Sequence, residues 1–150
     1  MTIVNLPASA TRPLRQQLLR PHQSVEQLVY DGDNEAETRH FCAFNDKGQH
    51  VGIVSIYLQT IRGQQAWQLR AMATIPEVRG QGYGKQLVEA AERYACTSDK
   101  RRGLKQTHIW ANARAAAEAF YVRLGYVPEG ELFEVAEIGP HRLIRKYINH

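Results

Sequence analysis

Three glycines within five residues, Gly80, Gly82 and Gly84, stand where the hydrophobic pattern of the chain changes. The segment before them, 66–75, has the pattern of a β-strand, and the segment after them, 83–98, places apolar residues at helical spacing. Glycine allows tight turns and lets the backbone approach a ligand closely. The chain must therefore pass from a strand into a helix through this turn, so the fold contains both.

The rest of the pattern predicts one central sheet. Strands come first, then strand, helix, strand and helix in alternation, and a hairpin closes the chain, which is typical of an α+β or mixed α/β domain. Neither a repeat nor a linker divides the sequence, so residues 1–150 are expected to form one domain. In chain order we expect a strand at 3–6, a helix at 10–20, a polar loop with room for one helical turn at 21–38, strands at 40–45, 51–59 and 66–75 joined by turns at 46–48 and 62–64, a helix at 83–98, a strand at 104–111, a helix at 113–124 and a hairpin over 126–148.

The composition is that of a globular protein in water. Apolar residues make up 43% and charged residues 23% of the 150 residues, and no apolar run approaches the ~20 residues that span a bilayer. The first residues lack the basic-then-apolar order of a secretory signal. We therefore expect a cytoplasmic protein with no membrane partner.

Cysteine and histidine give no sign of a metal site. The two cysteines, Cys42 and Cys96, are too few for a disulfide framework or a closed zinc site, and they are expected to be small buried hydrophobes. The six histidines show no metal-ligand spacing. No bound metal is expected.

The basic charge leaves several partners open. The net charge is +4 and the isoelectric point is about 9.2, with a basic run at 100–105 and a basic group at Arg142, Arg145 and Lys146. Such a balance favours an anionic partner: nucleic acid, a membrane or a phosphorylated cofactor. The other interpretation of the 100–105 run is a solvated surface at a helix end, where cations suit the helix dipole.

The glycine-rich turn is a candidate phosphate site. The free amides and the positive end of the following helix meet there, and Arg79 and Lys85 would add positive charge. The alternative is a connection that merely turns the chain. A Walker A loop does not fit, because only three residues separate Gly80 from Gly84 and Gln86 follows Lys85. A Rossmann fingerprint does not fit either, because the turn follows several predicted antiparallel strands.

The pattern of Arg79, Gly82 and Gly84 resembles the acetyl-CoA signature of the GNAT acetyltransferases: Gln or Arg, two residues, Gly, one residue, then Gly or Ala. Residues 69–84 look like that family's fourth strand, loop and phosphate turn. Residues 112–126 are similar to its second motif, an Asn at the end of the fifth strand and a helix ending FYxxxG. The resemblance implies a mostly antiparallel, twisted sheet of six to seven strands flanked by about four helices.

The resemblance also implies an activity, the transfer of an acetyl group from acetyl-CoA to a primary amine by direct attack in a ternary complex. The coenzyme A pyrophosphate would lie on the turn, the pantetheine arm would run beside the fourth strand, and a main-chain N–H near Met72 would contact the thioester oxygen. The residues implied for coenzyme A binding are Met72, Ala73, Thr74, Arg79, Gly80, Gln81, Gly82, Tyr83, Gly84, Lys85, Asn112 and Tyr121.

Tyr121 is the implied acid that protonates the departing thiolate, because a phenol with a pKa near ~10 still carries its proton at neutral pH. Its alternative role is a core aromatic, which suits Phe120 better. Asn112 is expected to contact the pantetheine amides or, alternatively, to cap the following helix. Many members of the family that the chain resembles carry a Glu on the fourth strand as the general base, but segment 66–74 contains no carboxylate. The candidates for the general base are therefore Glu134, His141 or water alone. A histidine can exchange protons near neutral pH, although His141 could also be a solvated turn residue.

The acceptor is expected to be a small-molecule amine or a peptide amine, walled by the loop at 21–40 and the last hairpin. The acidic group Asp31, Asp33, Glu35 and Glu37 would attract a cationic amine or would simply be solvated. Tyr30 is a candidate for the pocket wall, whereas Trp67 suits the core and His108 a structural role.

Two rival functions remain at this stage. One is a non-catalytic module that senses coenzyme A or a nucleotide, and the other is a nucleic-acid-binding protein. The presence of both Asn112 and Tyr121 disfavours the first, and the two motifs stay unexplained by the second. We therefore expect no nucleic-acid partner. The resemblance also implies a possible homodimer, since domains of this family often pair.

Overall fold

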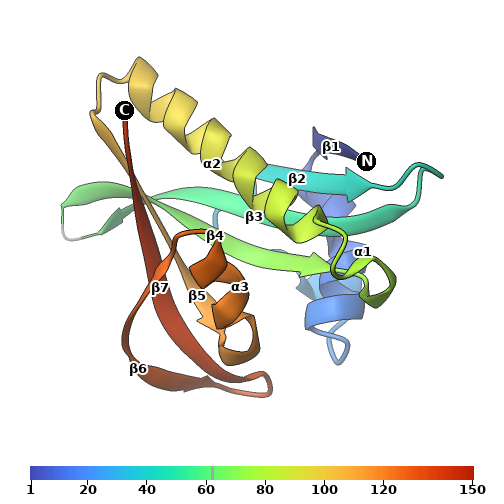
Figure 1. The fold of residues 1–150 in the computed structure, drawn as a ribbon. Helices are drawn as coiled ribbons and strands as arrows, with labels where there is room; N and C mark the ends of the chain where they lie inside the picture. Colours follow the sequence, from blue (N-terminus) through green and yellow to red (C-terminus); the bar gives the residue numbers. More distant parts are fainter. Residues whose placement is uncertain (62) are drawn as a thin grey trace.

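Seven strands form one sheet in the computed structural model, which describes residues 1–61 and 63–150 (Figure 1). Their order is β1-β2-β3-β4-β5-β7-β6, and all neighbours are antiparallel except β4 and β5, which are parallel. The expected mixed fold with a mostly antiparallel sheet is confirmed. The strands are β1 (Thr2–Asn5), β2 (Arg39–Phe44), β3 (His50–Ile61), β4 (Gln64–Thr74), β5 (Gln106–Arg114), β6 (Val127–Val135) and β7 (Gly139–Asn149).

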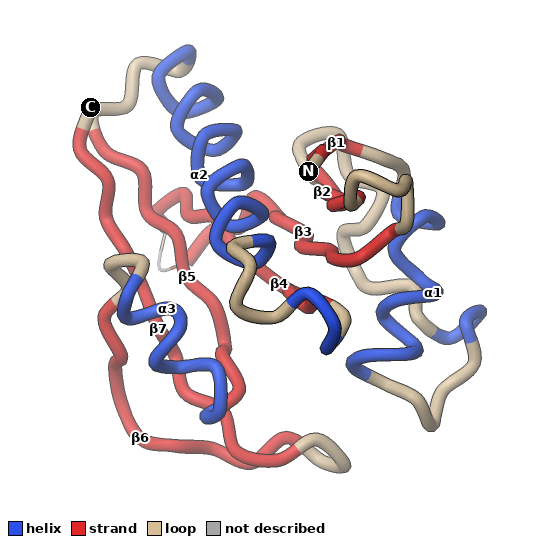
Figure 2. Tube along the Cα trace, turned by 45° about the vertical axis from the view of Figure 1, so that its right-hand side comes forward, coloured by secondary structure: helices blue, strands red, loops and turns tan. Residues whose placement is uncertain are grey.

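Helical segments cover both faces of the centre of the sheet. β3 is buried without a break from Val51 to Tyr57, and since successive side chains of a strand point to opposite faces, both faces must be covered. Helix α2 (Tyr83–Arg101) and the short helix α3 (Glu118–Arg123) lie on one face, and the helical segment around α1 (Arg12–Leu14) lies on the other (Figures 1 and 2).

Helix α2 packs on the sheet through the apolar residues that recur at helical spacing in the sequence. Its residues Leu87, Val88, Ala91 and Ala95 are fully buried at helical spacing. The helix continues to Arg101, three residues beyond the predicted end, and places two cations in its last turn, where they suit the helix dipole. The basic run at 100–105 therefore begins as a helix end.

The N-terminal helix is less regular than predicted. A 3₁₀ turn over Ala8–Thr11 leads into α1, and a wider turn over Arg15–Leu19 follows, closed by a hydrogen bond of 2.9 Å from the Arg20 amide to the Arg15 carbonyl. The hydrogen-bond register therefore changes at Arg15, whose side chain is fully buried among polar partners. A further 3₁₀ turn over Val25–Gln27 is the single helical turn expected in the loop.

The sheet opens between its two parallel strands. β4 and β5 pair only at Trp67–Ile109, Gln68–Trp110 and Leu69–Ala111. Past these pairs, β4 runs on to Thr74 and β5 to Arg114 without pairing to each other, and the two strands diverge (Figure 1). This divergence leaves a gap in the backbone pairing in the middle of the sheet.

Two predicted boundaries near this gap are wrong. The helix expected over 113–124 starts as a 3₁₀ turn at Ala115 and becomes α-helical only at Glu118, because β5 continues to Arg114, which pairs with His141 of β7. The described residues form three α-helices, where about four were expected. The hairpin over 126–148 is confirmed as β6 and β7, whereas the turn expected at 62–64 includes Arg62, which lies outside the described residues.

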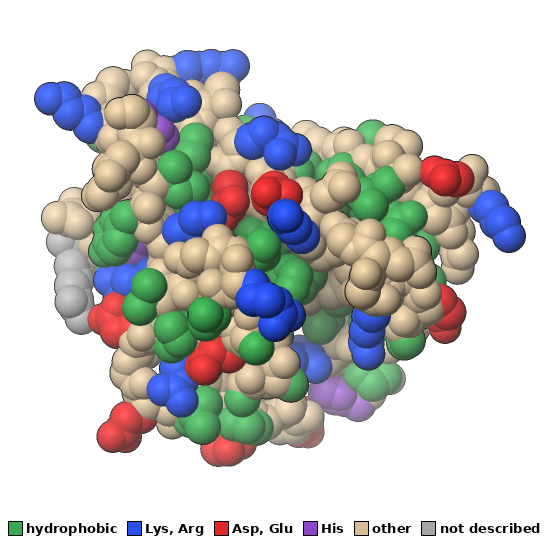
Figure 3. Space-filling model, viewed as in Figure 1, with side chains coloured by type: hydrophobic (Ala, Val, Ile, Leu, Met, Phe, Trp, Pro, Cys, Tyr) green, Lys and Arg blue, Asp and Glu red, His purple; other side chains and the backbone are tan. Residues whose placement is uncertain are grey.

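Basic and acidic side chains are interspersed on the surface (Figure 3). Several cations of the basic runs pair with carboxylates at 2.7–3.0 Å, so they do not form a surface of one sign. The pairs are Arg102–Glu37, Arg142–Glu118, Arg145–Glu129 and Lys146–Glu92.

Within the described residues, no helix has both the length and the apolar character needed to cross a membrane. In the same part of the chain, no group of three or more His, Cys, Asp or Glu side chains is arranged to hold a metal ion.

Candidate active site

The glycine-rich turn has the backbone that its sequence predicts. Between the 3₁₀ turn Pro76–Val78 and α2, Gly80 and Gly82 adopt φ of +82° and +86°, a conformation that favours glycine. A side chain added at either glycine would meet no atom within 4 Å. Glycine is therefore needed here for the backbone conformation, and the outer side of the turn is open to a ligand.

The helix that follows presents unused hydrogen-bond donors. Gly82 is its N-cap, and no side chain caps the helix. Among the described residues, the amides of Tyr83, Gly84 and Lys85 have no hydrogen-bond acceptor. Arg79 and Lys85 are exposed and form no ion pair with another described residue. Free amides, a positive helix end and two cations make a site that fits a pyrophosphate.

Gly84 joins this turn to the gap in the sheet. A Cβ on Gly84 would lie 3.2 Å from the Phe120 ring of α3 and 3.8 Å from the Met72 methyl group of β4. The first turn of α2 therefore packs against both walls of the gap, which places the phosphate site beside the gap.

A cavity of about 300 Å³ fills the space where β4 and β5 diverge. Its walls come from the N-terminal helical segment, the loop after it, both diverging strands, α3 and the turn between β6 and β7. The lining residues are Leu19, Arg20, Tyr30, Gln68, Leu69, Arg70, Ala71, Met72, Ala111, Asn112, Ala113, Arg114, Ala117, Tyr121, Val135, Ile138 and His141.

A bulge in β4 shapes one wall. The pairing with β3 moves from Ile53–Ala73 to Ser55–Arg70, so two residues, Ala71 and Met72, oppose one. Ala71 takes φ of +56°, which is unusual for a residue with a side chain. A bulge interrupts the hydrogen-bond ladder, so this is where β4 can turn main-chain donors toward the cavity. Met72, predicted to mark the oxyanion contact, lies in this bulge, whereas Ala73 and Thr74 follow it and do not line the cavity.

Tyr121 lines the cavity from α3. Its ring packs edge-on against Phe120 and Tyr126, with centroids 5.0 and 5.5 Å away. The hydroxyl makes no hydrogen bond with any described residue. Burial raises the pKa of Tyr121, so the phenol keeps its proton at neutral pH. Tyr121 is thus both a packed aromatic and a proton donor available to a ligand.

Asn112 belongs to β5 and does not cap a helix. It is paired with Leu143 in the β5–β7 ladder, and the N-cap position of the next turn is Arg114. Its side chain is exposed and lines the cavity. The capping interpretation is therefore wrong, and Asn112 is available to a bound ligand.

Of the two candidate bases, only His141 lines the cavity. His141 is buried at the cavity wall, and its Nδ1 lies 2.9 Å from the Gly139 carbonyl oxygen. A carbonyl only accepts, so Nδ1 carries a proton and Nε2 is the ring nitrogen that can accept one. Glu134 is exposed on β6 and does not line the cavity. No other described lining residue is a histidine or a carboxylate.

The arginines of the cavity were not among the residues predicted from the sequence. Arg20, Arg70 and Arg114 come from three separate segments, and each looks like an ordinary surface cation in its local sequence. The Arg114 guanidinium donates to the Leu19 carbonyl oxygen at 3.1 Å, which ties β5 to the N-terminal helical segment. Only the folded structure brings the three into one cavity.

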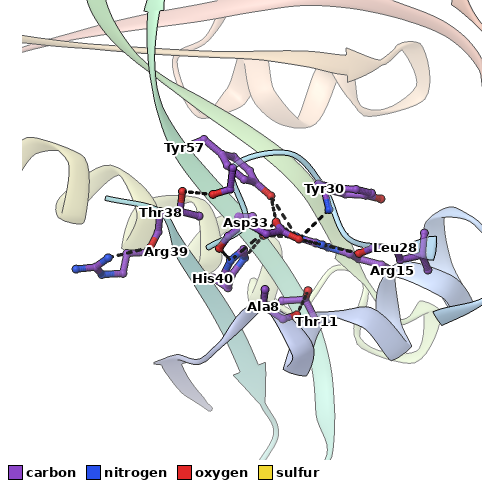
Figure 4. Close-up of polar contacts among 12 residues, drawn as sticks. Ala8, Thr11, Arg15, Leu28, Tyr30, Asp33, Thr38, Arg39, His40 and Tyr57 are labelled. Atoms are coloured by element: carbon purple, nitrogen blue, oxygen red, sulfur yellow. Dashed lines mark hydrogen bonds and ion pairs between the residues drawn. The ribbon is translucent and has the colours of Figure 1, made fainter. Parts of the chain in front are cut away.

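A buried polar network holds one wall of the cavity (Figure 4). Arg15 donates to both carboxylate oxygens of Asp33 at 2.7 and 3.0 Å, and Tyr57 donates to Asp33 at 2.6 Å. The Tyr30 amide donates to the same carboxylate at 2.9 Å. The guanidinium carbons of Arg15 and Arg70 lie 4.1 and 4.6 Å from the centre of the Tyr30 ring. Tyr30 therefore lines the cavity, as expected, because this network fixes its place.

The acidic group expected at the surface of the loop is partly buried and paired, and it does not lie in the cavity. Asp33 is 4% exposed and paired with Arg15, and Glu37 pairs with Arg102. Neither these two nor Asp31 and Glu35 line the cavity. Burial acts to raise the pKa of Asp33, but hydrogen bonds from Arg15, Tyr57 and the Tyr30 amide outweigh it and lower the pKa to about 2.

Two further predictions on single residues are confirmed. Trp67 is fully buried and donates to Asp99 at 3.1 Å, so it belongs to the core. Cys42 is fully buried, and burial raises the pKa of its thiol to about 11. Cys96 is only half-buried. Neither cysteine lines the cavity.

Comparisons with known proteins show the family of the chain. Residues 36–128 match the family described as "Acetyltransferase (GNAT) domain". The chain is 34% identical over 139 residues to the uncharacterized N-acetyltransferase YitI of Bacillus subtilis, covering 91% of this chain and 89% of that protein.

Solved structures share the fold. Escherichia coli ElaA superposes with a TM-score of 0.71 at 20% identity, covering 97% of both chains. An aminoglycoside 6'-N-acetyltransferase in complex with coenzyme A superposes with a TM-score of 0.63 at 16% identity, covering 98% of this chain and 97% of that one. With the family match over 36–128 and a relative that is similar along most of its length, the chain belongs to the GNAT acetyltransferases.

Proposed function

We propose that this acetyltransferase takes its acetyl group from acetyl-CoA and transfers it directly to a primary amine held in the cavity between β4 and β5. The observation that carries the proposal is the junction at Gly84, where a turn that fits a pyrophosphate meets a cavity lined by a protonated phenol. The structural neighbour that holds coenzyme A supports the choice of donor.

The residues of the chain would bind the donor as follows. The amides of Tyr83, Gly84 and Lys85, with Arg79, Gly80, Gln81 and Gly82 around them, hold the pyrophosphate. Asn112 and the main chain of β4 beside Met72 hold the pantetheine arm. Acetyl-CoA bound in this way supplies an acetyl thioester to the cavity.

The chemistry then needs an acid, a base and an oxyanion donor. The amine nitrogen bonds to the thioester carbon as the carbon–sulfur bond breaks, and the products are the N-acetylated amine and the coenzyme A thiol. Tyr121 donates the proton that the sulfur gains. His141 Nε2, directly or through water, accepts the proton that the amine loses. A main-chain N–H in the β4 bulge near Met72 donates to the carbonyl oxygen as its charge grows.

Direct transfer is favoured over an acetylated enzyme by the composition of the cavity. None of its described lining residues is Cys, Ser, Thr or Lys, the side chains that usually accept an acyl group. Burial also raises the pKa of both cysteines, which disfavours their thiolates.

Calorimetric titration with acetyl-CoA tests the donor site. Gly82→Trp fills the open side of the turn and should abolish the micromolar-range binding that we expect of the wild type. Gly48→Trp is the matched control, since Gly48 also has a positive φ (+78°) and open space at its Cβ but lies in the β2–β3 turn. Equal binding by Gly82→Trp and Gly48→Trp, or no binding by the wild type, would contradict the proposal.

A further inference from the structure

The acceptor side of the cavity is positively charged. Arg20, Arg70 and Arg114 line it, and among its described lining residues none is Asp or Glu. None of these three arginines forms an ion pair with another described residue. Arg15, Arg102, Arg142 and Arg145 each pair with a carboxylate, whereas these three arginines line a cavity that has no carboxylate among its described lining residues.

The three arginines line one cavity, and none of its described lining residues is a carboxylate that would compensate their charge. Burial and the neighbouring charge of Arg20 both lower the pKa of Arg114, so the two cations are close enough to repel each other. Contacts with the rest of the chain hold two of the three in place, since Arg70 lies over the Tyr30 ring and Arg114 donates to the Leu19 carbonyl oxygen. Guanidinium groups fixed around a cavity are suited to bind an anion, and planar oxyanions fit them in a bidentate way.

These cations belong to the acceptor side rather than to the coenzyme A phosphates. Trp67 of β4 bonds to Asp99 of α2, so the odd-numbered side of β4 at that point faces α2, the helix whose N-terminal end carries the phosphate turn. Gln68 and Arg70 point to the other face, where Arg70 lies over Tyr30 and Tyr57 beside the N-terminal helical segment. The donor would therefore enter from the α2 face and the anion would be held on the opposite one.

His141 lies next to this anion site. It is directly opposite Arg114 in the β5–β7 ladder, and both residues line the cavity. An acceptor whose anionic group reaches Arg114 can therefore present its amine near the proposed base.

Resting on the acetyl transfer proposed above, we infer that the acceptor is a small amine that also carries an anionic group, a carboxylate or a phosphate, bound by Arg20, Arg70 and Arg114. Polyamines and aminoglycosides are poor acceptors, because their additional ammonium groups would face three arginines with no carboxylate in the cavity to compensate.

A panel of matched amines tests this inference by the release of coenzyme A thiol. Leucine is compared with leucinamide, phosphoethanolamine with ethanolamine, and spermidine represents the polycations. We expect kcat/KM for at least one anionic amine to exceed that of its partner without the anionic group by about 10-fold or more, and the better of the two pairs identifies carboxylate or phosphate. Faster acetylation of spermidine or of the partners that lack the anionic group, or no acetylation of any anionic amine, would overturn the inference.

Variants locate the anion site. Arg70→Gln and Arg114→Gln should raise KM for the preferred anionic amine about 10- to 100-fold, and Arg70→Lys should recover only part of the loss because it lacks the planar fork. Arg20→Gln is the variant that should least disturb the fold, since the Arg20 side chain makes no hydrogen bond to a described residue. Arg101→Gln, at the far end of α2, is the matched control and should leave KM unchanged.

Calorimetry with acetyl-CoA on the same variants separates the two proposals. Binding within about twofold of the wild type, together with a raised acceptor KM, supports the anion site. Weaker acetyl-CoA binding with an unchanged acceptor KM would assign these arginines to the donor and overturn the inference. Failure of the wild type to bind acetyl-CoA would instead refute the proposed function itself.

Discussion

At the scale of single residues, Tyr121 combines packing with an unused hydroxyl. Its ring is fixed by Phe120 and Tyr126, whereas its hydroxyl has no partner among the described residues. Its neighbour Tyr126 shows the contrast, because that hydroxyl donates to Glu92 at 2.9 Å. The Tyr121 hydroxyl is therefore free to donate a hydrogen bond to a ligand in the cavity, as the proposed mechanism requires.

Removing that hydroxyl should slow the chemistry and spare the fold. Tyr121→Phe is expected to lower kcat about 10²- to 10⁴-fold, the usual contribution of a positioned acid. The dissociation constant for acetyl-CoA and the midpoint of thermal unfolding should stay near those of the wild type, since the ring remains and no internal hydrogen bond is lost.

Tyr147→Phe is the control for this variant. Tyr147 is 52% exposed on β7, stacked on His108 with ring centroids 4.4 Å apart, and away from the cavity lining. The Tyr147→Phe variant should keep the kcat of the wild type. If Tyr121→Phe turned over at the wild-type rate, the role of Tyr121 as acid would be wrong, and water would be the donor.

At the scale of elements, the N-terminal helical segment and the loop after it are joined by one buried ion pair. Arg15, in the wide turn at Arg15–Leu19, reaches across to Asp33 and also donates to the Leu28 carbonyl at 2.9 Å. Ser55 and His40 of the sheet extend the network, with His40 Nδ1 2.7 Å from the Ser55 hydroxyl. The wall that carries Tyr30 therefore depends on charges that water does not reach.

Breaking the pair should destabilise the protein. Asp33→Asn leaves the Arg15 charge buried without its partner, which is expected to cost about 3–5 kcal/mol in the free energy of unfolding at pH 7. Chemical denaturation measures this, and acceptor KM should rise as Tyr30 loses its support. Asp46→Asn, which breaks an exposed pair with the N-terminus, should leave stability unchanged.

The pH dependence of that stability has a defined sign. The pKa of Asp33 is about 2 in the folded chain, below its ordinary value of 3.8. Its contribution is therefore complete above about pH 4 and is lost as the pH falls from there toward 2. The Asp33→Asn variant should lack this component of acid unfolding; an identical acid profile in both proteins would contradict a stabilising role for the Asp33 charge.

At the scale of the whole molecule, the proposed function depends on the gap between β4 and β5. The two strands pair at only three positions and then diverge, so the sheet itself opens a passage between its faces. Helix α2 presents the phosphate turn on one face, and the N-terminal segment presents Arg20 and Tyr30 on the other. Donor and acceptor can thus approach the same cavity from opposite sides.

The sequence predicted the features that depend on local pattern. The glycine turn, α2 and the final hairpin follow from backbone requirements and hydrophobic period, and each is confirmed. The Ala-rich stretch after Asn112 was predicted to be helical from its composition, but cross-strand pairing with β7 holds it as a strand as far as Arg114. Tertiary contacts decided the boundary there.

The residues on the acceptor side of the cavity could not be predicted from the sequence, for a different reason. Its three arginines are separated by 50 and 44 residues along the chain, at positions 20, 70 and 114, and nothing in their neighbours indicates a cavity. Asp33 looked like one member of an acidic loop, and only the fold shows that Arg15 binds it. Features built from distant segments require the three-dimensional structure.

The central claim is direct transfer between two ligands that share one cavity, and steady-state kinetics with both substrates varied tests it most directly. Thiol release should require both acetyl-CoA and the amine, and double-reciprocal plots should give lines that intersect, because both must be bound before the acetyl group moves. Parallel lines would show an acetylated enzyme and contradict direct attack. Thiol release that does not depend on the amine would contradict an acceptor site in the cavity.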